Sequence, residues 1–146
     1  MIKRGANAYQ TQQIMTASPV MLVAMLYDKA IQSLKKAVIA IDAGDIRERW
    51  NANNRAFEII QHLQRTLDRE RGGEIAANLD TLYGHMLRVL PQVDMKNDQE
   101  AARNVIRLLE PLRDSWRQAA GNRNALATPM AKPALEPLAQ HTVVSA

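Results

Sequence analysis

The chain has 146 residues, with 19 basic and 15 acidic side chains, a formal net charge of +4 and no cysteine. Without cysteine, disulfides, thiolate metal sites and a cysteine nucleophile are excluded, and a hydrophobic fraction of 47% excludes a wholly disordered chain. No apolar run approaches the roughly 18–20 residues that span a bilayer, and no signal peptide is evident, so we expect a single-domain protein of the cytoplasm.

The first predicted helix follows a polar segment. Residues 1–17 show no helical period and carry only isolated apolar side chains, so we expect a flexible arm. Ser18 and Pro19 predict a helix start, because serine caps exposed N–H groups and proline suits the first helical position. The helix should run to about Asp42, before Gly44. Its expected core stripe follows spacings of three and four: Val23, Tyr27, Ala30, Leu34, Ala37, Val38 and Ile41.

The second predicted helix begins at Asp45, a suitable N-cap. Its expected core side carries Ile46, Trp50, Asn53, Phe57, Ile60, Leu63 and Leu67. Asn53 has two interpretations. It is either a bundle asparagine satisfied by a neighbouring helix, which we favour, or a polar contact to the backbone of a partner.

The third predicted helix opens at Glu74, after the break at Gly72-Gly73. It carries two neighbouring stripes, Ile75, Leu79, Leu82, Met86 and Val89, and Ala76, Tyr83, Leu87 and Leu90. Pro91 should end or kink it. A fourth helix, capped by Asp98, should run to Trp116 or a little further, with a kink at Pro111.

These four amphipathic segments, joined by short connections, predict an all-α fold. We expect an antiparallel up-down four-helix bundle over residues 18–120, with the flexible N-terminal arm 1–17 before it. Repeated prolines after Gly121 predict a disordered C-terminal tail over residues 121–146, to which the sequence assigns no role.

One side of the first helix is unusually apolar near its start. Leu22, Met25 and Leu26 point away from the core stripe. The residues that continue that side further along are polar: Lys29, Ser33 and Lys36. An apolar patch that a partner covers would explain this change. A central helix surrounded by the other helices would explain it equally well.

The sequence offers little for catalysis. It has no glycine-rich phosphate loop or nucleophile elbow, and its histidines show no Glu-x-x-His spacing of the kind that bundle metal sites use. We therefore predict no enzyme and no cofactor. Two alternatives remain: a basic helical adaptor that binds nucleic acid, supported only by the net charge, and a metal- or cofactor-carrying bundle enzyme.

Three blocks of the sequence stand out together, over about residues 9–118. The first block is Tyr9, Ile14, Thr16-Ala17-Ser18-Pro19, Leu22, Met25-Leu26-Tyr27-Asp28 and Ala30-Ile31. The second is Leu67-Asp68, Gly72-Gly73-Glu74-Ile75-Ala76-Ala77-Asn78-Leu79, Leu82-Tyr83 and Met86. The third is Asn97-Asp98 with Val105, Leu108-Leu109, Leu112-Arg113 and Trp116. In order and spacing, these blocks resemble the flagellin export chaperones of the FliS family.

The resemblance implies a cytoplasmic export chaperone that binds the C-terminal segment of flagellin, prevents its premature polymerisation and delivers it to the flagellar type III secretion apparatus. It implies the flagellar export gate as a second partner, with neither nucleic acid nor direct membrane insertion. The N-terminal arm would cover the apolar surface when cargo is absent, and Tyr9 and Ile14 occupy the matching places. We assign flagellin binding to Tyr9, Ile14, Leu22, Met25, Leu26, Asp28, Ile75, Asn78, Leu79, Leu82 and Met86.

Overall fold

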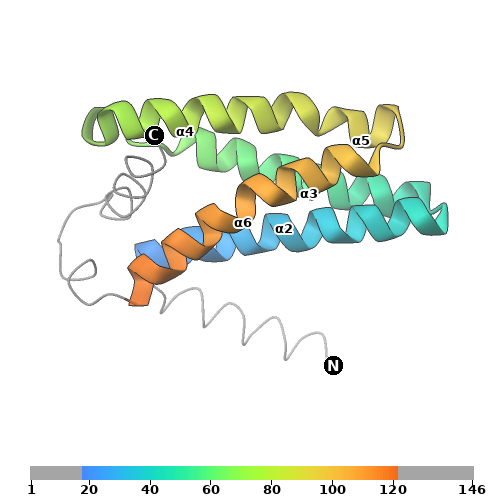
Figure 1. The fold of residues 1–146 in the computed structure, drawn as a ribbon, viewed down its shortest axis with the longest axis horizontal. Helices are drawn as coiled ribbons and strands as arrows, with labels where there is room; N and C mark the ends of the chain where they lie inside the picture. The colour runs from blue at the N-terminus through green and yellow to red at the C-terminus, as the bar shows by residue number, and fades with distance from the viewer. Residues whose placement is uncertain (1–17, 122–146) are drawn as a thin grey trace.

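The structure, a computed structural model, describes residues 18–121. Four long helices pack against one another as an up-down bundle (Figure 1), which confirms the predicted all-α four-helix fold. The helices are α2 (Pro19–Ala43), α3 (Ile46–Arg65), α4 (Arg69–Val89), the short α5 (Pro91–Met95) and α6 (Gln99–Gly121). The predicted arm 1–17, with Tyr9 and Ile14, and residues 122–146 of the predicted tail lie outside the described residues.

Each predicted N-cap is in place. The Ser18 side chain accepts a hydrogen bond from the Met21 amide at 3.1 Å, and Asp45 accepts one from the Glu48 amide at the same distance. Asp98 accepts from two amides in the first turn of α6. These bonds satisfy amide donors that a helix start otherwise leaves unpaired, so the helix boundaries follow from local side-chain chemistry.

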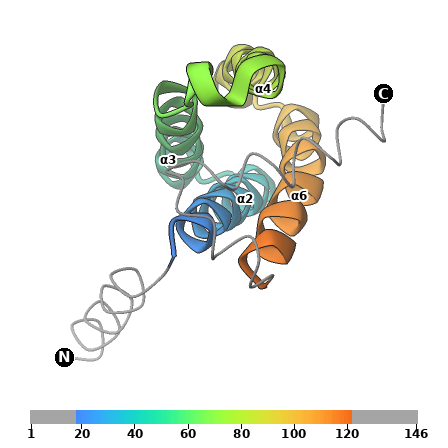
Figure 2. The ribbon, with the colours of Figure 1, turned by 90° about the vertical axis from the view of Figure 1, so that its left-hand side faces the viewer.

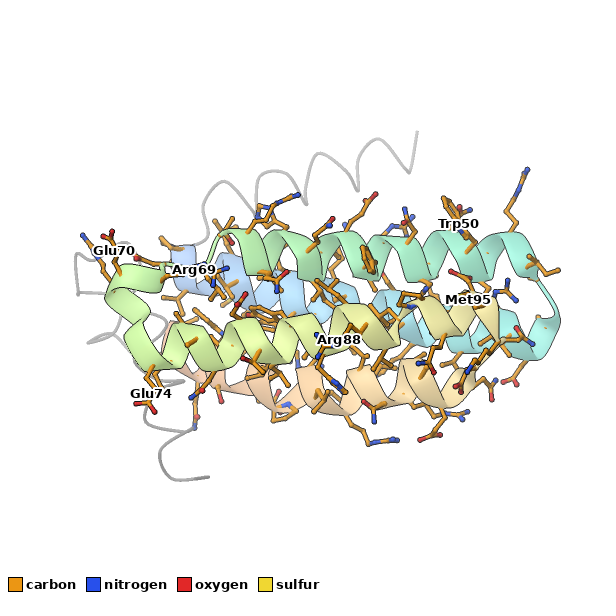
Figure 3. All side chains as sticks on the ribbon, turned by 90° about the horizontal axis from the view of Figure 1, so that it is seen from above. Trp50, Arg69, Glu70, Glu74, Arg88 and Met95 are labelled. Atoms are coloured by element: carbon orange, nitrogen blue, oxygen red, sulfur yellow. The ribbon has the colours of Figure 1, made fainter. Side chains whose placement is uncertain are left out.

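The start of α4 differs from the prediction. Helical structure begins at Arg69, with Asp68 as the N-cap, and only then breaks at Gly73, which has φ 49° and ψ −124°. The prediction that Glu74 opens this helix is therefore wrong, although the break itself is confirmed. Figure 3 shows Arg69 before the break and Glu74 after it. Arg69 pairs with Asp80 at 3.1 Å and lowers the pKa of that carboxyl, which ties the first turn to the main part of α4.

Pro91 and Pro111 have different effects on the helices that contain them. Pro91 follows the end of α4 and begins α5, because proline suits the first turn of a helix. Pro111 lies inside α6, which was predicted to run to Trp116 or a little further and ends at Gly121, the first residue of the predicted tail. Proline has no N–H to bond to the preceding turn, and the Ser115 hydroxyl donates to the Pro111 carbonyl at 3.1 Å.

Helix α2 lies between α3 and α6, and α4 completes the bundle on the opposite side (Figure 2). The interfaces around α2 are lined by small side chains, which let helices approach closely. The buried alanines of these three helices are Ala24, Ala30, Ala37 and Ala40 on α2, Ala52 and Ala56 on α3, and Ala101, Ala102, Ala119 and Ala120 on α6. Helix α2 therefore packs between two helices but is not surrounded by the others, since Lys29, Lys36 and Ile39 on its outer side are exposed.

Close packing by alanine also explains an error in the predicted core. Ile46 and Trp50 were expected on the buried side of α3, but they are 68% and 54% exposed. The helix is turned so that Ala52 and Ala56 face the core instead. A tryptophan at that interface would push α3 away from α2, whereas an alanine lets the two backbones approach.

Two aromatic hydroxyls meet in the core. Tyr27 of α2 and Tyr83 of α4 hydrogen-bond to each other, and the Tyr27 ring centroid lies 6.2 Å from that of Trp116 on α6. Burial raises the pKa of Tyr27 to about 12 and that of Tyr83 well above its ordinary value of 10.0. Both hydroxyls therefore stay neutral at physiological pH, and together they link α2 to α4.

Asn53 follows the favoured interpretation. Its amide nitrogen donates to the Leu90 carbonyl and to an Asp94 carboxylate oxygen, each at 3.0 Å. Arg49 donates to the other Asp94 oxygen at 3.0 Å and to the Asn97 side chain at 2.9 Å. This network joins α3 to α5 through the Asn53 amide nitrogen, whereas the Asn53 side-chain oxygen is buried without a hydrogen-bond partner among the described residues.

Candidate protein-binding surface

The apolar side of α2 is open to solvent near the start of the helix. We define the α2 patch as Met21, Leu22, Met25 and Leu26. Met21 is 37% exposed and the other three side chains are partly exposed, whereas Tyr27 on the opposite side is fully buried. Of the four, Leu26 packs against the core cluster. Helices α3 and α6 thus leave this side of the first two turns of α2 accessible, as the apolar-patch interpretation requires.

Met21 was not among the predicted site residues. The sequence could have indicated Met21, because this residue lies four positions before Met25 and therefore on a neighbouring part of the same helical surface. Methionine side chains are flexible and polarisable, and they suit surfaces that adapt to a partner. The structure adds Met21 to the candidate surface.

Asp28 lies at the edge of this surface but already has partners. Its carboxylate accepts hydrogen bonds from Arg113 at 3.4 Å and from Arg117 at 3.1 Å, both on α6. The side chain of Arg113 is only 16% exposed. Asp28 was predicted to bond to the backbone of cargo or gate, and in this structure its contacts instead join α2 to α6.

The predicted residues on α4 divide into two groups. Ile75 and Leu82 are partly exposed and Asn78 is exposed, so all three are accessible at the surface. Leu79 is 5% exposed and Met86 is fully buried in the core cluster. A partner could reach these last two side chains only after α4 moved away from the core.

A second set of exposed apolar side chains lies away from the α2 patch. Besides Trp50 and Ile46, it includes Ile39 at 66% exposed and Met95 at 78% exposed. In Figure 3, Trp50 and Met95 lie toward the same end of the bundle, the end where the short α5 leads into α6. The sequence pattern did not predict this set, and Ile46 and Trp50 were expected in the core.

Within residues 18–121, no three histidine, aspartate or glutamate side chains come close enough together to hold a metal ion. No helix in that range is long and apolar enough to cross a membrane. The described surface is thus distinguished by its apolar side chains rather than by a cluster of reactive groups.

Comparison with known proteins gives a consistent result. A family model described as "Flagellar protein FliS" matches residues 1–123. The flagellar secretion chaperone FliS of Salmonella typhimurium is 38% identical over 118 residues, which are 80% of this chain and 87% of the relative. The protein of the same name from Bacillus subtilis is 36% identical over 119 residues, 81% of this chain and 87% of the relative. The protein of the same name from Campylobacter jejuni is 33% identical over 116 residues, which are 80% of this chain and 91% of the relative.

Proposed function

The chain belongs to the FliS family of flagellar secretion chaperones, and from this membership we propose that it binds the C-terminal segment of flagellin in the cytoplasm. Binding would keep the subunit from polymerising before export and deliver it to the flagellar type III secretion apparatus. The export gate would be the second partner. Membership of a chaperone family also confirms the prediction that the chain is not an enzyme.

The α2 patch is the observation that supports this proposal. An amphipathic segment can lay its apolar face on such a surface and exclude water from it. Leu22, Met25 and Leu26 would form the first contact, since they are partly exposed without any rearrangement. Ile75 and Leu82 on α4 would extend the contact around the bundle.

The buried residues of the predicted site have a place in the same proposal. Leu79 and Met86 would contact cargo only if α4 separates from the core, which first requires the Tyr27–Tyr83 hydrogen bond to break. Tyr9 and Ile14 would cover the α2 patch in the absence of cargo. Asp28 and Asn78 would bond to cargo or gate backbone, Asp28 by exchanging its arginine partners on α6.

Calorimetric titration with a synthetic C-terminal segment of flagellin from the same organism tests the proposal. The intact protein should bind one segment, and a Met25→Asp substitution should abolish binding because it places a charge in the apolar contact. Met95→Asp is the matched control. Met95 is a more exposed methionine outside the α2 patch, so its substitution should leave affinity unchanged.

The outcomes test separately whether the protein binds flagellin and whether the α2 patch is the binding surface. If Met25→Asp and Met95→Asp both bind like the intact protein, the function stands and the α2 patch is the wrong surface. If the intact protein fails to bind the segment at all, the flagellin assignment is overturned. Titration with nucleic acid at low salt would then test the basic adaptor, whose binding should weaken steeply as salt rises.

A further inference from the structure

The two flanks of α2 differ in charge. On the flank that faces α6, Asp28 pairs with Arg113 and Arg117, and Asp42 accepts a hydrogen bond from Gln99. Both acidic side chains in the body of α2 are therefore directed toward α6. The lysines Lys29 and Lys36 lie on the other flank, on the side that Leu22 and Met25 of the α2 patch occupy in the first two turns.

The spacing along the helix places these lysines in line with the patch. Leu22, Met25, Lys29 and Lys36 are separated by three, four and seven residues, which is the repeat of a single helical face. The face therefore begins with apolar side chains and continues with two positive charges. The two lysines are separated by two helical turns, about 10 Å along the axis.

Neither lysine has a charged partner within the part of the chain that the structure describes. Both side chains are exposed, and neither takes part in an ion pair or hydrogen bond among residues 18–121. Lys35 provides the contrast on the same helix. It is equally exposed but lies seven residues from both Asp28 and Asp42, so its own flank already carries negative charge.

We propose that Lys29 and Lys36 select the segment that this chaperone binds, by receiving two carboxylates that lie about seven residues apart on it. This inference rests on the proposed function and names the chemistry of its cargo: a helical segment with an apolar stretch followed by two acidic side chains. The apolar stretch covers the α2 patch. The carboxylates then lie over the lysines because both helices advance by the same distance per turn.

The expected energies are those of surface ion pairs. Each exposed pair contributes modestly to binding, and charge reversal replaces that attraction with repulsion. In about 0.1 M salt, the double substitution Lys29→Glu with Lys36→Glu should weaken binding by about tenfold or more. In about 1 M salt, where the screening length falls to about 3 Å, the difference from the intact protein should shrink to about twofold.

The experiment compares this double variant with Lys35→Glu, using the synthetic C-terminal flagellin segment as the probe in calorimetric titration. Lys35→Glu should change affinity by less than about twofold. A probe in which the two carboxylates are replaced by lysine should bind the double variant more tightly than it binds the intact protein. Thermal unfolding followed by circular dichroism checks that both variants remain folded.

Each outcome has a distinct meaning. If the double variant and Lys35→Glu lose affinity equally, or if the loss persists in high salt, the charge-selection proposal is overturned while the chaperone function stands. If the lysine-substituted probe fails to prefer the double variant, the pairing of carboxylates with these two lysines is refuted. If the intact protein does not bind the unmodified probe, the proposed function itself fails.

Discussion

The hydroxyl groups of Tyr27 and Tyr83 hydrogen-bond to each other in the core of the bundle, although the two residues lie on helices that face each other across it. Their ring centroids are 6.4 Å apart. Both side chains are almost fully buried, so water cannot replace either partner. The pair acts as a polar link between α2, which carries the candidate binding surface, and α4.

Replacing either tyrosine by phenylalanine should destabilise the protein. Tyr83→Phe leaves the Tyr27 hydroxyl buried without its partner, which should lower the free energy of unfolding by about 1–3 kcal/mol. The double variant leaves no orphaned hydroxyl, so its loss should be smaller than the sum of the two single losses. Urea unfolding followed by circular dichroism measures all three values. Additive losses would show that the hydroxyls do not interact.

Stability should also fall at high pH. The pKa of Tyr27 is about 12 in the folded protein, against an ordinary value near 10 for an exposed tyrosine. Since folding raises this pKa, the stabilisation is complete below about pH 10 and is lost as the pH rises toward 12. In a Tyr9→Phe background, tyrosinate absorbance should appear only together with unfolding. Absorbance that appears near pH 10 in a fully helical protein would contradict this.

The two tryptophans should respond differently to a quencher. The side chain of Trp50 is 54% exposed, whereas Trp116 is 5% exposed beside Tyr27. Because the chain has only these two tryptophans, Trp116→Phe and Trp50→Phe each leave a single fluorophore. Acrylamide should quench the fluorescence of Trp50 strongly and that of Trp116 weakly. Equal quenching would mean that α3 is turned differently from the arrangement described.

Alanine substitutions at two glycines should change the stability of the protein in opposite directions. Gly44 ends α2 with φ 68°, a conformation that alanine adopts only with strain, so Gly44→Ala should cost about 1 kcal/mol. Gly84 lies inside α4, where an added Cβ would meet the flexible Arg88 side chain at 3.4 Å. Gly84→Ala should stabilise the protein by up to about 1 kcal/mol. Thermal unfolding distinguishes the two effects, and a destabilised Gly84→Ala variant would show that Arg88 cannot move aside.

Alanine substitution at Met86 should affect mainly the stability of the protein, whereas alanine substitution at Met25 should affect mainly binding. Met86 is fully buried, and Met86→Ala should cost about 2–5 kcal/mol because it leaves a cavity. Met25 is partly exposed, and Met25→Ala should change the unfolding free energy by less than about 1 kcal/mol while weakening binding of the flagellin segment. Denaturation and titration of both variants test this. Equal losses of stability would place Met25 in the core as well.

Much of the fold follows from local signals in the sequence. Ser18, Asp45 and Asp98 each combine an oxygen-bearing side chain with a following apolar period, and each caps a helix as predicted. The rotation of α3 could not be predicted in the same way. A stripe through Trp50 and a stripe through Ala52 are both compatible with the sequence, and the choice depends on how closely α2 approaches.

The candidate surface was predictable in part. The change from Leu22 and Met25 to Lys29 and Lys36 is visible in the sequence, because helical spacing alone puts these residues on one face. The burial of Met86 is not visible, since it depends on how α4 packs against the rest of the bundle. The partners of Asp28 were missed for a similar reason, because Arg113 and Arg117 are far from it in sequence.

The described chain enters and leaves the bundle at one end. The contacts of Tyr27 with Trp116 and of Asp28 with Arg117 bring the start of α2 beside the last turns of α6, as Figure 1 also shows. The two segments outside residues 18–121 therefore both join the bundle at the end of the molecule that carries Met21 and Met25. The turn at Gly44 and Asp45, at the far end of α2, offers an attachment point for a probe that leaves this surface unobstructed.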